Sequence, residues 1–232
     1  MYQAESYSGI EALESMASAH NYNRHLDQLI ARAAGIRKIM LDFGAGDGLH
    51  ARALAEQSYS VSCVEPDAEL QSRLVAAGLT VHNTLEEVND GSIEFIYSLN
   101  VLEHIVDDEA VLRLMFRKLT SDGALLIYVP AFPLLFSNFD RQIGHVRRYR
   151  KMQLRRKIRE AGFQLQRSTY VDSLGFFAAL LYKVFDRSGG SLNSATVRLF
   201  DRFVFPASLV CDRVLFGLLG KNLAVVAAKP HP

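Results

Sequence analysis

The stretch Leu41-Asp42-Phe43-Gly44-Ala45-Gly46-Asp47-Gly48 decides the fold of this chain, because it places a glycine-rich turn directly after an apolar run. A helical pattern begins at Leu49, so the turn joins a predicted strand to a predicted helix. Open α/β sheets bind ligands at the carboxyl ends of their strands, which is where such a turn lies. Glycine lets the backbone approach a ligand closely and adopt positive φ. The stretch therefore predicts an α/β fold with a ligand crevice at residues 44–48.

Short apolar runs alternate with helical patterns from residue 38 onward, which is typical of βαβ units around a parallel sheet. The runs are continuous, as expected for strands that are covered on both faces. We predict strands at residues 39–43, 60–65, 80–83, 93–99, 124–129, 163–171 and 223–228. We predict helices at residues 49–57, 68–77, 107–119 and 151–161, the second and fourth ending at Gly78 and Gly162 as left-handed caps.

Residues 172–222 separate the last two predicted strands and are rich in phenylalanine. Apolar residues recur at helical spacing in this segment, so we expect a helical insertion with an apolar face. Residues 188–191 and Pro206 predict breaks between two or three helices. Charged residues interrupt every apolar stretch of the segment before it reaches the roughly 20 residues that span a bilayer.

The composition of the 232 residues sets limits on function. With 26 Lys and Arg against 25 Asp and Glu, the formal net charge is +1, which gives no global field for nucleic acid or an anionic surface. Cys63 and Cys211 lie far apart and have no metal-ligand spacing, so we expect neither a disulfide scaffold nor a metal site. Residues 1–19 have no signal-peptide pattern, and we expect a cytoplasmic protein.

A carboxylate follows the glycine loop at a spacing that indicates ribose binding. Glu65 ends the next predicted strand, nineteen residues after Gly46, where an acid would accept the hydroxyls of a ribose. An exposed acid at a strand end is the alternative. A dinucleotide fingerprint requires glycine or alanine at the position of Leu49, so the loop disfavours an NAD-dependent oxidoreductase but leaves it open.

Four motifs together resemble class I S-adenosylmethionine-dependent methyltransferases: LDFGAGDG, VEPD, SLNVLEHI and GALLIYVP. The resemblance covers the whole chain, and segments 19–24 and 144–149 are similar to a bacterial subgroup of glycan or lipid-linked sugar pathways. It implies a Rossmann-like, doubly wound, mostly parallel seven-stranded sheet with an antiparallel last strand and a helical insertion before it. We expect one domain over residues 1–232, with an N-terminal helical cover at 1–37 and the insertion at 172–222.

The resemblance also implies S-adenosylmethionine as the cofactor and assigns residues to it. Asp42, Gly44, Ala45 and Gly46 would line the methionine side, and Tyr22 would close over the cofactor. The remaining implied contacts are Glu65 with the ribose, Pro66, Asn83 and Thr84 with the adenine, and Asn100 and Val101 beside the sulfonium. Asn83 departs from the family, which often has an acid there, but an amide oxygen can still accept the adenine amino group.

His145 is the candidate general base, because it follows the fifth strand on the cofactor side of the sheet and imidazole titrates near neutrality. Substrate binding or helix capping is the alternative for it, and for His104 we expect a structural role. Nine basic residues without an acid fill residues 141–159. We assign acceptor binding to Arg147, Arg148 and Tyr149, since guanidinium groups bind phosphate oxygens bidentately. A solvated helix face is the alternative for the two arginines, and packing is the alternative for Tyr149 and for Tyr22. For residues 155–159 we expect a solvated surface.

The resemblance and these residues together predict methyl transfer to a small-molecule acceptor, most readily to an oxygen atom. We expect this acceptor to be lipid-linked, phosphorylated or otherwise amphiphilic. Basic and apolar faces together suit peripheral contact with a membrane, although a buried cap or a dimer interface would explain the same aromatic residues. We expect no nucleic-acid partner, because no aromatic and basic recognition module accompanies the basic segment. A non-catalytic scaffold that binds S-adenosylmethionine remains an alternative.

Overall fold

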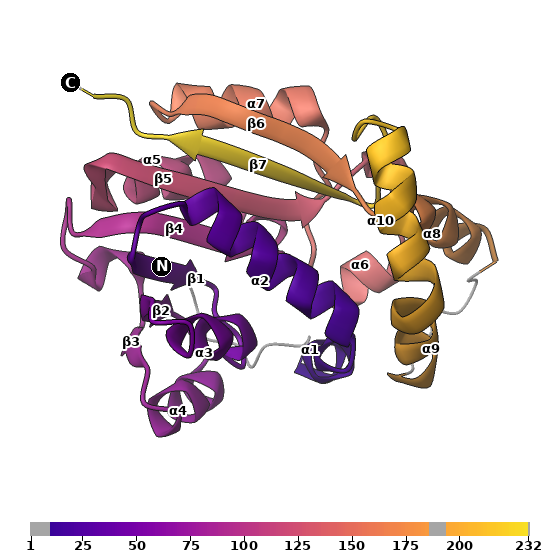
Figure 1. The fold of residues 1–232 in the computed structure, drawn as a ribbon, viewed down its shortest axis with the longest axis horizontal. Helices are drawn as coiled ribbons and strands as arrows, with labels where there is room; N and C mark the ends of the chain where they lie inside the picture. Colours follow the sequence, from indigo (N-terminus) through magenta and orange to yellow (C-terminus); the bar gives the residue numbers. More distant parts are fainter. Residues whose placement is uncertain (1–9, 186–193, 232) are drawn as a thin grey trace.

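A single seven-stranded sheet of order β3-β2-β1-β4-β5-β7-β6 forms the centre of the computed structural model, which describes residues 10–185 and 194–231 (Figure 1). The strands are β1 (Ile39–Phe43), β2 (Ser60–Val64), β3 (Thr80–His82), β4 (Ile93–Leu99), β5 (Leu119–Pro130), β6 (Gln164–Val171) and β7 (Asn222–Ala228). The pairs among β1 to β5 are parallel, and β7 is antiparallel to both β5 and β6. This arrangement confirms the predicted fold class and the antiparallel last strand.

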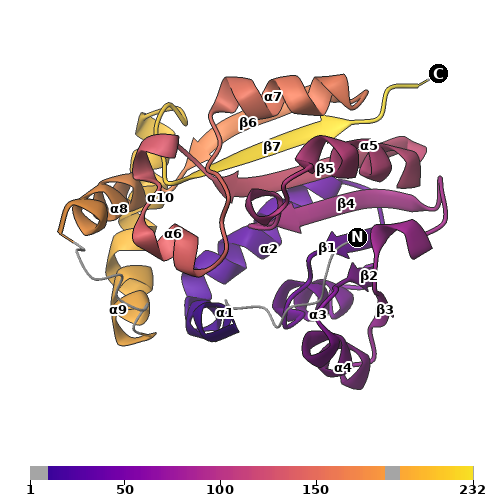
Figure 2. The ribbon, with the colours of Figure 1, turned by 180° about the vertical axis from the view of Figure 1, so that it is seen from behind.

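Helices cover both faces of the sheet. On one face lie α2 (His20–Ala34) and α3 (Leu49–Ala55), and on the other lie α5 (Asp108–Lys118) and α7 (Lys151–Glu160), as the two opposite views show (Figures 1 and 2). Apolar side chains from α2 and α3 pack on β1 and β4 in one cluster, and those of α5 and α7 join a larger cluster on the other face. The continuous apolar runs of the central strands are thus buried from both sides.

The helical insertion lies at the end of the sheet to which the carboxyl ends of the parallel strands point (Figure 1). It comprises α8 (Ser173–Phe185), α9 (Ser194–Leu199), the π-helical turn η4 (Phe200–Val204) and α10 (Phe205–Val214). The buried Asp201 carboxylate accepts the backbone N–H groups of Asn21 and Tyr22, at 2.9 and 2.8 Å. The insertion therefore holds the N-terminus of α2 in place.

The predicted break at Pro206 is wrong. Helical backbone continues from α9 through η4 into α10, and Pro206 lies in the first turn of α10. Proline has no backbone N–H to donate to the preceding turn, and Pro206 lies where the hydrogen-bond pattern changes from the π-helical turn η4 to α10. The other predicted break, at residues 188–191, lies outside the described residues.

Element boundaries otherwise follow the sequence pattern closely. The positive φ values of Gly78 and Gly162 are those of the left-handed residues predicted after α4 (Ala68–Ala76) and α7. Strand β5 begins five residues earlier than predicted, because Leu119 pairs with Ile93 before an irregularity in the register. No helix in residues 10–185 or 194–231 is long and apolar enough to cross a membrane.

Candidate active site

The glycine loop and Glu65 meet at the carboxyl ends of β1 and β2. The Glu65 carboxylate accepts the backbone N–H of Gly46 at 2.8 Å and that of Asp67 at 3.1 Å. Gly44 has a φ of +80°, and a Cβ atom there would collide with the Val101 side chain that follows β4. Each carboxylate oxygen has lone pairs left for further donors. The structure thus brings Gly44, Gly46 and Glu65 together around a turn in which both glycines have positive φ.

Asp42 is buried at the end of β1, beside this loop. Burial raises the pKa of its carboxyl group to about 7, and the carboxylates of Glu65 and Asp47 add to the rise. His50 lowers the pKa, and the His50 ring in turn lies 2.7 Å from Asp27. A buried acid near half-ionisation favours a cationic ligand that would stabilise its charge.

Residues predicted for the adenine end lie after β2 and β3. The Asn83 side-chain oxygen accepts a hydrogen bond from Gln71 at 2.9 Å, and the Asn83 backbone N–H donates to Glu87 at 2.9 Å. The Glu87 carboxylate therefore lies beside the backbone of Asn83. Pro66 and Thr84 occupy the turns that follow β2 and β3.

Tyr22 enters the site from α2 and reaches the end of β4. Its hydroxyl lies beside the side chains of Tyr128 and Asn100, and burial raises its pKa to about 12. Its ring packs edge-on against Phe205 of the insertion, with centroids 5.3 Å apart. Asn100 has a positive φ of 55°. The insertion, α2 and β4 together thus fix the position of Tyr22.

Leu13 of α1 (Ile10–Ala17) is a neighbour of the glycine loop that the sequence did not reveal. Its side chain lies against Gly46, so close that a Cβ on that glycine would be 3.2 Å from Leu13 Cδ2. A leucine in an amphipathic N-terminal helix carries no distinguishing signal, because it looks the same whether it covers a core or a ligand crevice.

His145 lies in the segment between β5 and α7, and two contacts hold it there. Its Nδ1 atom is 2.8 Å from Asp140 Oδ1, and the neighbouring Val146 N–H donates to the Glu103 carbonyl at 2.9 Å. Asp140 is fully buried, and Ser137 and Arg148 also donate to it. Although burial acts to raise the pKa of Asp140, hydrogen bonds from His145 and Arg148 hold it well below its usual value. An ionised Asp140 places the imidazole proton on Nδ1 and leaves the lone pair on Nε2.

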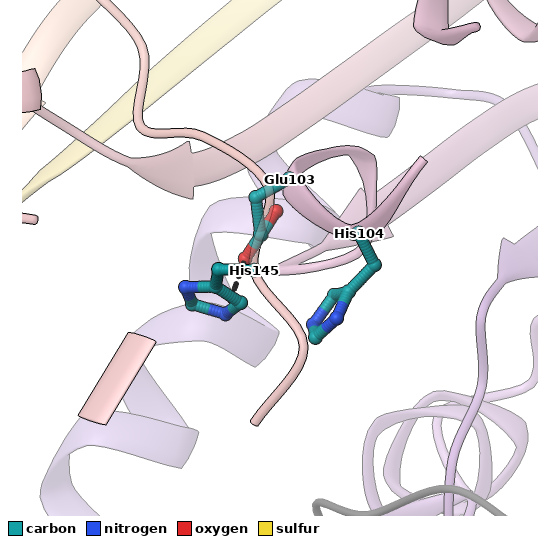
Figure 3. A group of neighbouring side chains, drawn as sticks. All are labelled: Glu103, His104 and His145. Carbon is teal, nitrogen blue, oxygen red and sulfur yellow. Dashed lines mark ion pairs between the residues drawn. The ribbon is translucent and has the colours of Figure 1, made fainter. Parts of the chain in front are cut away.

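The Nε2 atom of His145 points toward Glu103, which lies in the short helix η2 (Leu102–His104) after β4 (Figure 3). Nε2 and Glu103 Oε1 are 3.6 Å apart, and the His104 ring packs edge-on against His145 at a centroid distance of 4.6 Å. Burial raises the pKa of Glu103 to about 8 and lowers that of His104 to about 4. Two imidazoles and one carboxyl group thus gather where β4 ends.

The residues predicted to bind the acceptor are held by the protein itself. Tyr149 is fully buried, and its hydroxyl donates to Asp108 at 2.7 Å, which favours packing over the lining of an acceptor pocket for this side chain. Arg147 pairs with Asp108 at 2.9 Å. Arg148 pairs with Asp140, but its Nη1 atom is buried without a hydrogen-bond partner among the described residues. The Nη1 atom of Arg148 could therefore donate a hydrogen bond to an anion.

Comparisons with known proteins give the same picture of the chain. Residues 18–168 match the family described as "Methyltransferase domain". A protein of Mycolicibacterium smegmatis, named "Probable S-adenosylmethionine-dependent methyltransferase", is 26% identical over 189 residues, which cover 76% of this chain and 70% of that protein.

Two solved structures share the fold. An S-adenosylmethionine-dependent methyltransferase from Archaeoglobus fulgidus superposes with a TM-score of 0.61 at 16% identity, covering 91% of this chain and 94% of the other. Phosphoethanolamine N-methyltransferase 2 from Haemonchus contortus, solved with S-adenosylmethionine, also gives 0.61 at 18% identity and covers 89% of this chain and 53% of that one. The glycine cradle and the two buried acids Asp42 and Glu65 fit the ammonium and ribose groups of this cofactor.

Proposed function

This chain belongs to the methyltransferase domain family and uses S-adenosylmethionine as its methyl donor, and we propose that it methylates an oxygen atom of a small, anionic acceptor. The observation that carries the proposal is the 2.8 Å contact between His145 Nδ1 and Asp140 Oδ1. Bound S-adenosylmethionine supplies a methyl group that is already activated for displacement. The protein must then align the acceptor and remove its hydroxyl proton.

His145 is the group we propose to take that proton. Asp140 fixes the ring orientation and stabilises the imidazolium, as the carboxylate does in other acid–histidine pairs. The acceptor hydroxyl proton moves to His145 Nε2 while the oxygen forms its bond to the methyl carbon. Amine acceptors that are already neutral need this base less, so the pair favours oxygen.

Arg148 supports an anionic acceptor. Its Nε and Nη2 atoms bind Asp140 at 2.9 and 3.0 Å, and Nη1 remains unpartnered within the described residues. A buried guanidinium N–H without an acceptor is costly, and a phosphate or carboxylate oxygen would satisfy it. The acceptor would therefore carry its negative charge a short distance from its methylated hydroxyl.

For the cofactor contacts, we propose the set that the motifs imply. Asp42, Gly44, Ala45 and Gly46 would hold the methionine end and Tyr22, Asn100 and Val101 would border the methyl group. Glu65 would bind the ribose, and Pro66, Asn83 and Thr84 the adenine. The burial of Asp42 and Glu65 and the collision that any Cβ at Gly44 would cause support this assignment.

The helical insertion supports peripheral contact of the enzyme with an anionic membrane, which would suit a lipid-linked acceptor. The two acids in the described insertion helices are both hydrogen bonded within the protein. Asp201 accepts N–H groups at the N-terminus of α2, and Asp212 accepts the N–H groups of Asp172 and Ser173 at 2.8 Å. The other described charges of the insertion helices are basic, and the exposed large apolar side chains are Phe177, Leu181, Tyr182, Val184, Leu199, Phe203, Val210, Val214, Leu215, Phe216 and Leu218. We call these eleven side chains the apolar surface. Apolar and basic groups together bind anionic interfaces.

A screen of acceptors tests the proposed chemistry. S-adenosylhomocysteine release is measured with sets of matched compounds that carry a hydroxyl or an amine, each with and without a phosphate or carboxylate. We expect turnover with anionic hydroxyl compounds. Turnover confined to amines, or to neutral compounds, would contradict the proposal.

A further inference from the structure

Three side chains that meet beyond the end of β4 have the composition of a metal centre. Glu103 and His104 lie in η2, and His145 comes from the segment before α7, 41 positions further along the chain than His104 (Figure 3). One carboxylate oxygen and one nitrogen from each imidazole lie within 4.8 Å of one another. Two imidazoles and a carboxylate can bind one face of a divalent transition-metal ion and leave other positions open.

The carboxylate of Glu103 is the second, independent observation. Its side chain is 0% exposed, and among the described residues neither carboxylate oxygen has a hydrogen-bond partner. The His145 Nε2 atom, at 3.6 Å, is too distant for a hydrogen bond. A buried carboxyl group without a hydrogen-bond partner is costly, and its charged form is normally paired or bound to a metal. One carboxylate oxygen of Glu103 points toward the His145 ring, and the His104 ring lies on the neighbouring side of the same cluster (Figure 3).

The surroundings of the two imidazoles suit ligation. Asp140 binds His145 Nδ1 at 2.8 Å, which leaves Nε2 as the ligand atom. A carboxylate on the far nitrogen is the usual outer contact of a metal-bound histidine, because it fixes the tautomer and raises the basicity of the ring. His104 hydrogen bonds the Gly144 backbone through its ring, which fixes its orientation in the same way.

We propose that Glu103, His104 and His145 bind a divalent transition-metal ion such as Zn²⁺, Co²⁺ or Fe²⁺. Metal–nitrogen and metal–oxygen distances near 2.0–2.2 Å require the three ligand atoms to move slightly closer together than their 4.8 Å limit. Mg²⁺ and Ca²⁺ do not suit the site, because they prefer oxygen ligands.

The inference goes beyond the proposed function, since it concerns the protein without acceptor or cofactor. Metal and proton compete for the same lone pair on His145 Nε2. An ion bound there would prevent His145 from accepting a proton, and we expect it to slow methyl transfer. Metal binding and base catalysis can therefore be separated by experiment.

Calorimetric titration of the tag-free, chelator-treated protein with ZnSO₄ tests the site, and visible absorption of the Co²⁺ form reports the ligand geometry. We expect one ion per chain. Glu103→Gln and His104→Ala should abolish binding, and Asp140→Asn should weaken it by roughly 10- to 100-fold through the orientation of His145. His231→Ala is the matched control, because this exposed histidine pairs with Asp122 outside the cluster.

Folding of each variant is checked by circular dichroism, and its melting temperature is measured with and without Zn²⁺. A rise in melting temperature with Zn²⁺ in the wild-type protein and in His231→Ala, but not in Glu103→Gln, supports the site. Absence of stoichiometric binding in the wild-type protein, or equal binding by folded Glu103→Gln, overturns it. If binding occurs but chelation abolishes turnover, the metal site stands and His145 is not the base.

Discussion

Asp140 Oδ1 lies 2.8 Å from His145 Nδ1, so an ionised buried acid fixes the orientation of the imidazole ring. Asp140 lies five residues before His145 in a loop that also includes the short helix α6 (Asn138–Gln142), where its side chain completes a capping box with Ser137. The same carboxylate thus orders the loop and orients the imidazole. Asp140 therefore both caps α6 and orients the proposed base.

Replacing His145 with alanine should lower kcat by roughly 10²- to 10⁴-fold, which is the range for loss of a positioned base. The affinity for S-adenosylhomocysteine should change little, because His145 is not among the proposed cofactor contacts. Asp140→Asn should give a smaller loss of kcat, since the base is then misoriented but present. Turnover with an acceptor from the screen and calorimetry measure the two effects. Equal losses of kcat and cofactor affinity would give His145 a structural role instead.

Tyr149→Phe distinguishes the packing role of this residue from an acceptor contact. Its hydroxyl bonds Asp108 and the Leu102 carbonyl, which connects the His145 loop to α5 and η2. Loss of a buried hydrogen bond to a charged group should lower the free energy of unfolding by about 1.5 to 3 kcal/mol, as measured by urea denaturation. The acceptor KM should stay the same. Tyr59→Phe, at a less buried site, is the control and should cost less than about 0.5 kcal/mol. A raised KM with unchanged stability would restore the acceptor role.

Cofactor affinity should depend on pH through Asp42. Its pKa is raised to about 7 in the folded protein, so the carboxyl group is mostly protonated at pH 6 and mostly ionised at pH 8. A cationic ammonium group binds the ionised form better, and the affinity for S-adenosylhomocysteine should rise by about tenfold between these values if only that form binds. The effect on stability without ligand has the opposite sign, because the unfolded acid loses its proton first and stability falls as pH rises toward 7. Calorimetry on Asp42→Asn, which cannot titrate, should show a flatter profile. An identical profile in wild type and variant would exclude Asp42 as the cause.

Membrane contact should depend on the apolar surface. Phe203→Glu combined with Phe216→Glu places two acids among side chains that are 62% and 87% exposed. We expect sedimentation with anionic liposomes to weaken by about tenfold or more, since each phenylalanine contributes on the order of 1.5 kcal/mol when buried. Ile36→Glu is the matched control, because Ile36 is 94% exposed but lies near the start of β1. The membrane proposal would be contradicted if the wild-type protein did not bind anionic liposomes. If the wild-type protein were a dimer that the double variant disrupts, the apolar surface would instead be an interface between two copies of the chain.

Local patterns in the sequence predicted most of the sheet and the glycine loop. Apolar runs such as 39–43 and 93–99 became strands at the same residues, because a strand covered on both faces needs a continuous apolar run. The collision at Gly44 comes from Val101, which is far away in sequence, yet the loop was recognisable from glycine spacing alone. At Gly44 both the local backbone conformation and the packing of Val101 require glycine.

Contacts between distant segments were beyond the sequence. The sequence left both pocket lining and packing open for Tyr149, because its partner Asp108 is 41 residues earlier in the chain. Glu103 was visible within a motif, and only the fold shows that its buried carboxylate faces His145. The break at Pro206 was predicted from the proline alone, and the π-helical turn that precedes it has no recognisable sequence pattern. Pairing of charges across elements depends on topology, which composition and periodicity do not encode.

The most direct test of the cofactor site is calorimetric titration with S-adenosylhomocysteine beside NAD, on the wild-type protein, Glu65→Ala and Glu69→Gln. Glu65 is buried and accepts the N–H of Gly46. Glu69 is an exposed acid that pairs with Arg73 within α4, the helix that follows. We predict micromolar binding of S-adenosylhomocysteine and no binding of NAD. Glu65→Ala should weaken binding by about 1 to 3 kcal/mol, and Glu69→Gln should leave it unchanged. Binding of NAD alone, or unchanged affinity in Glu65→Ala, would contradict this account of the site.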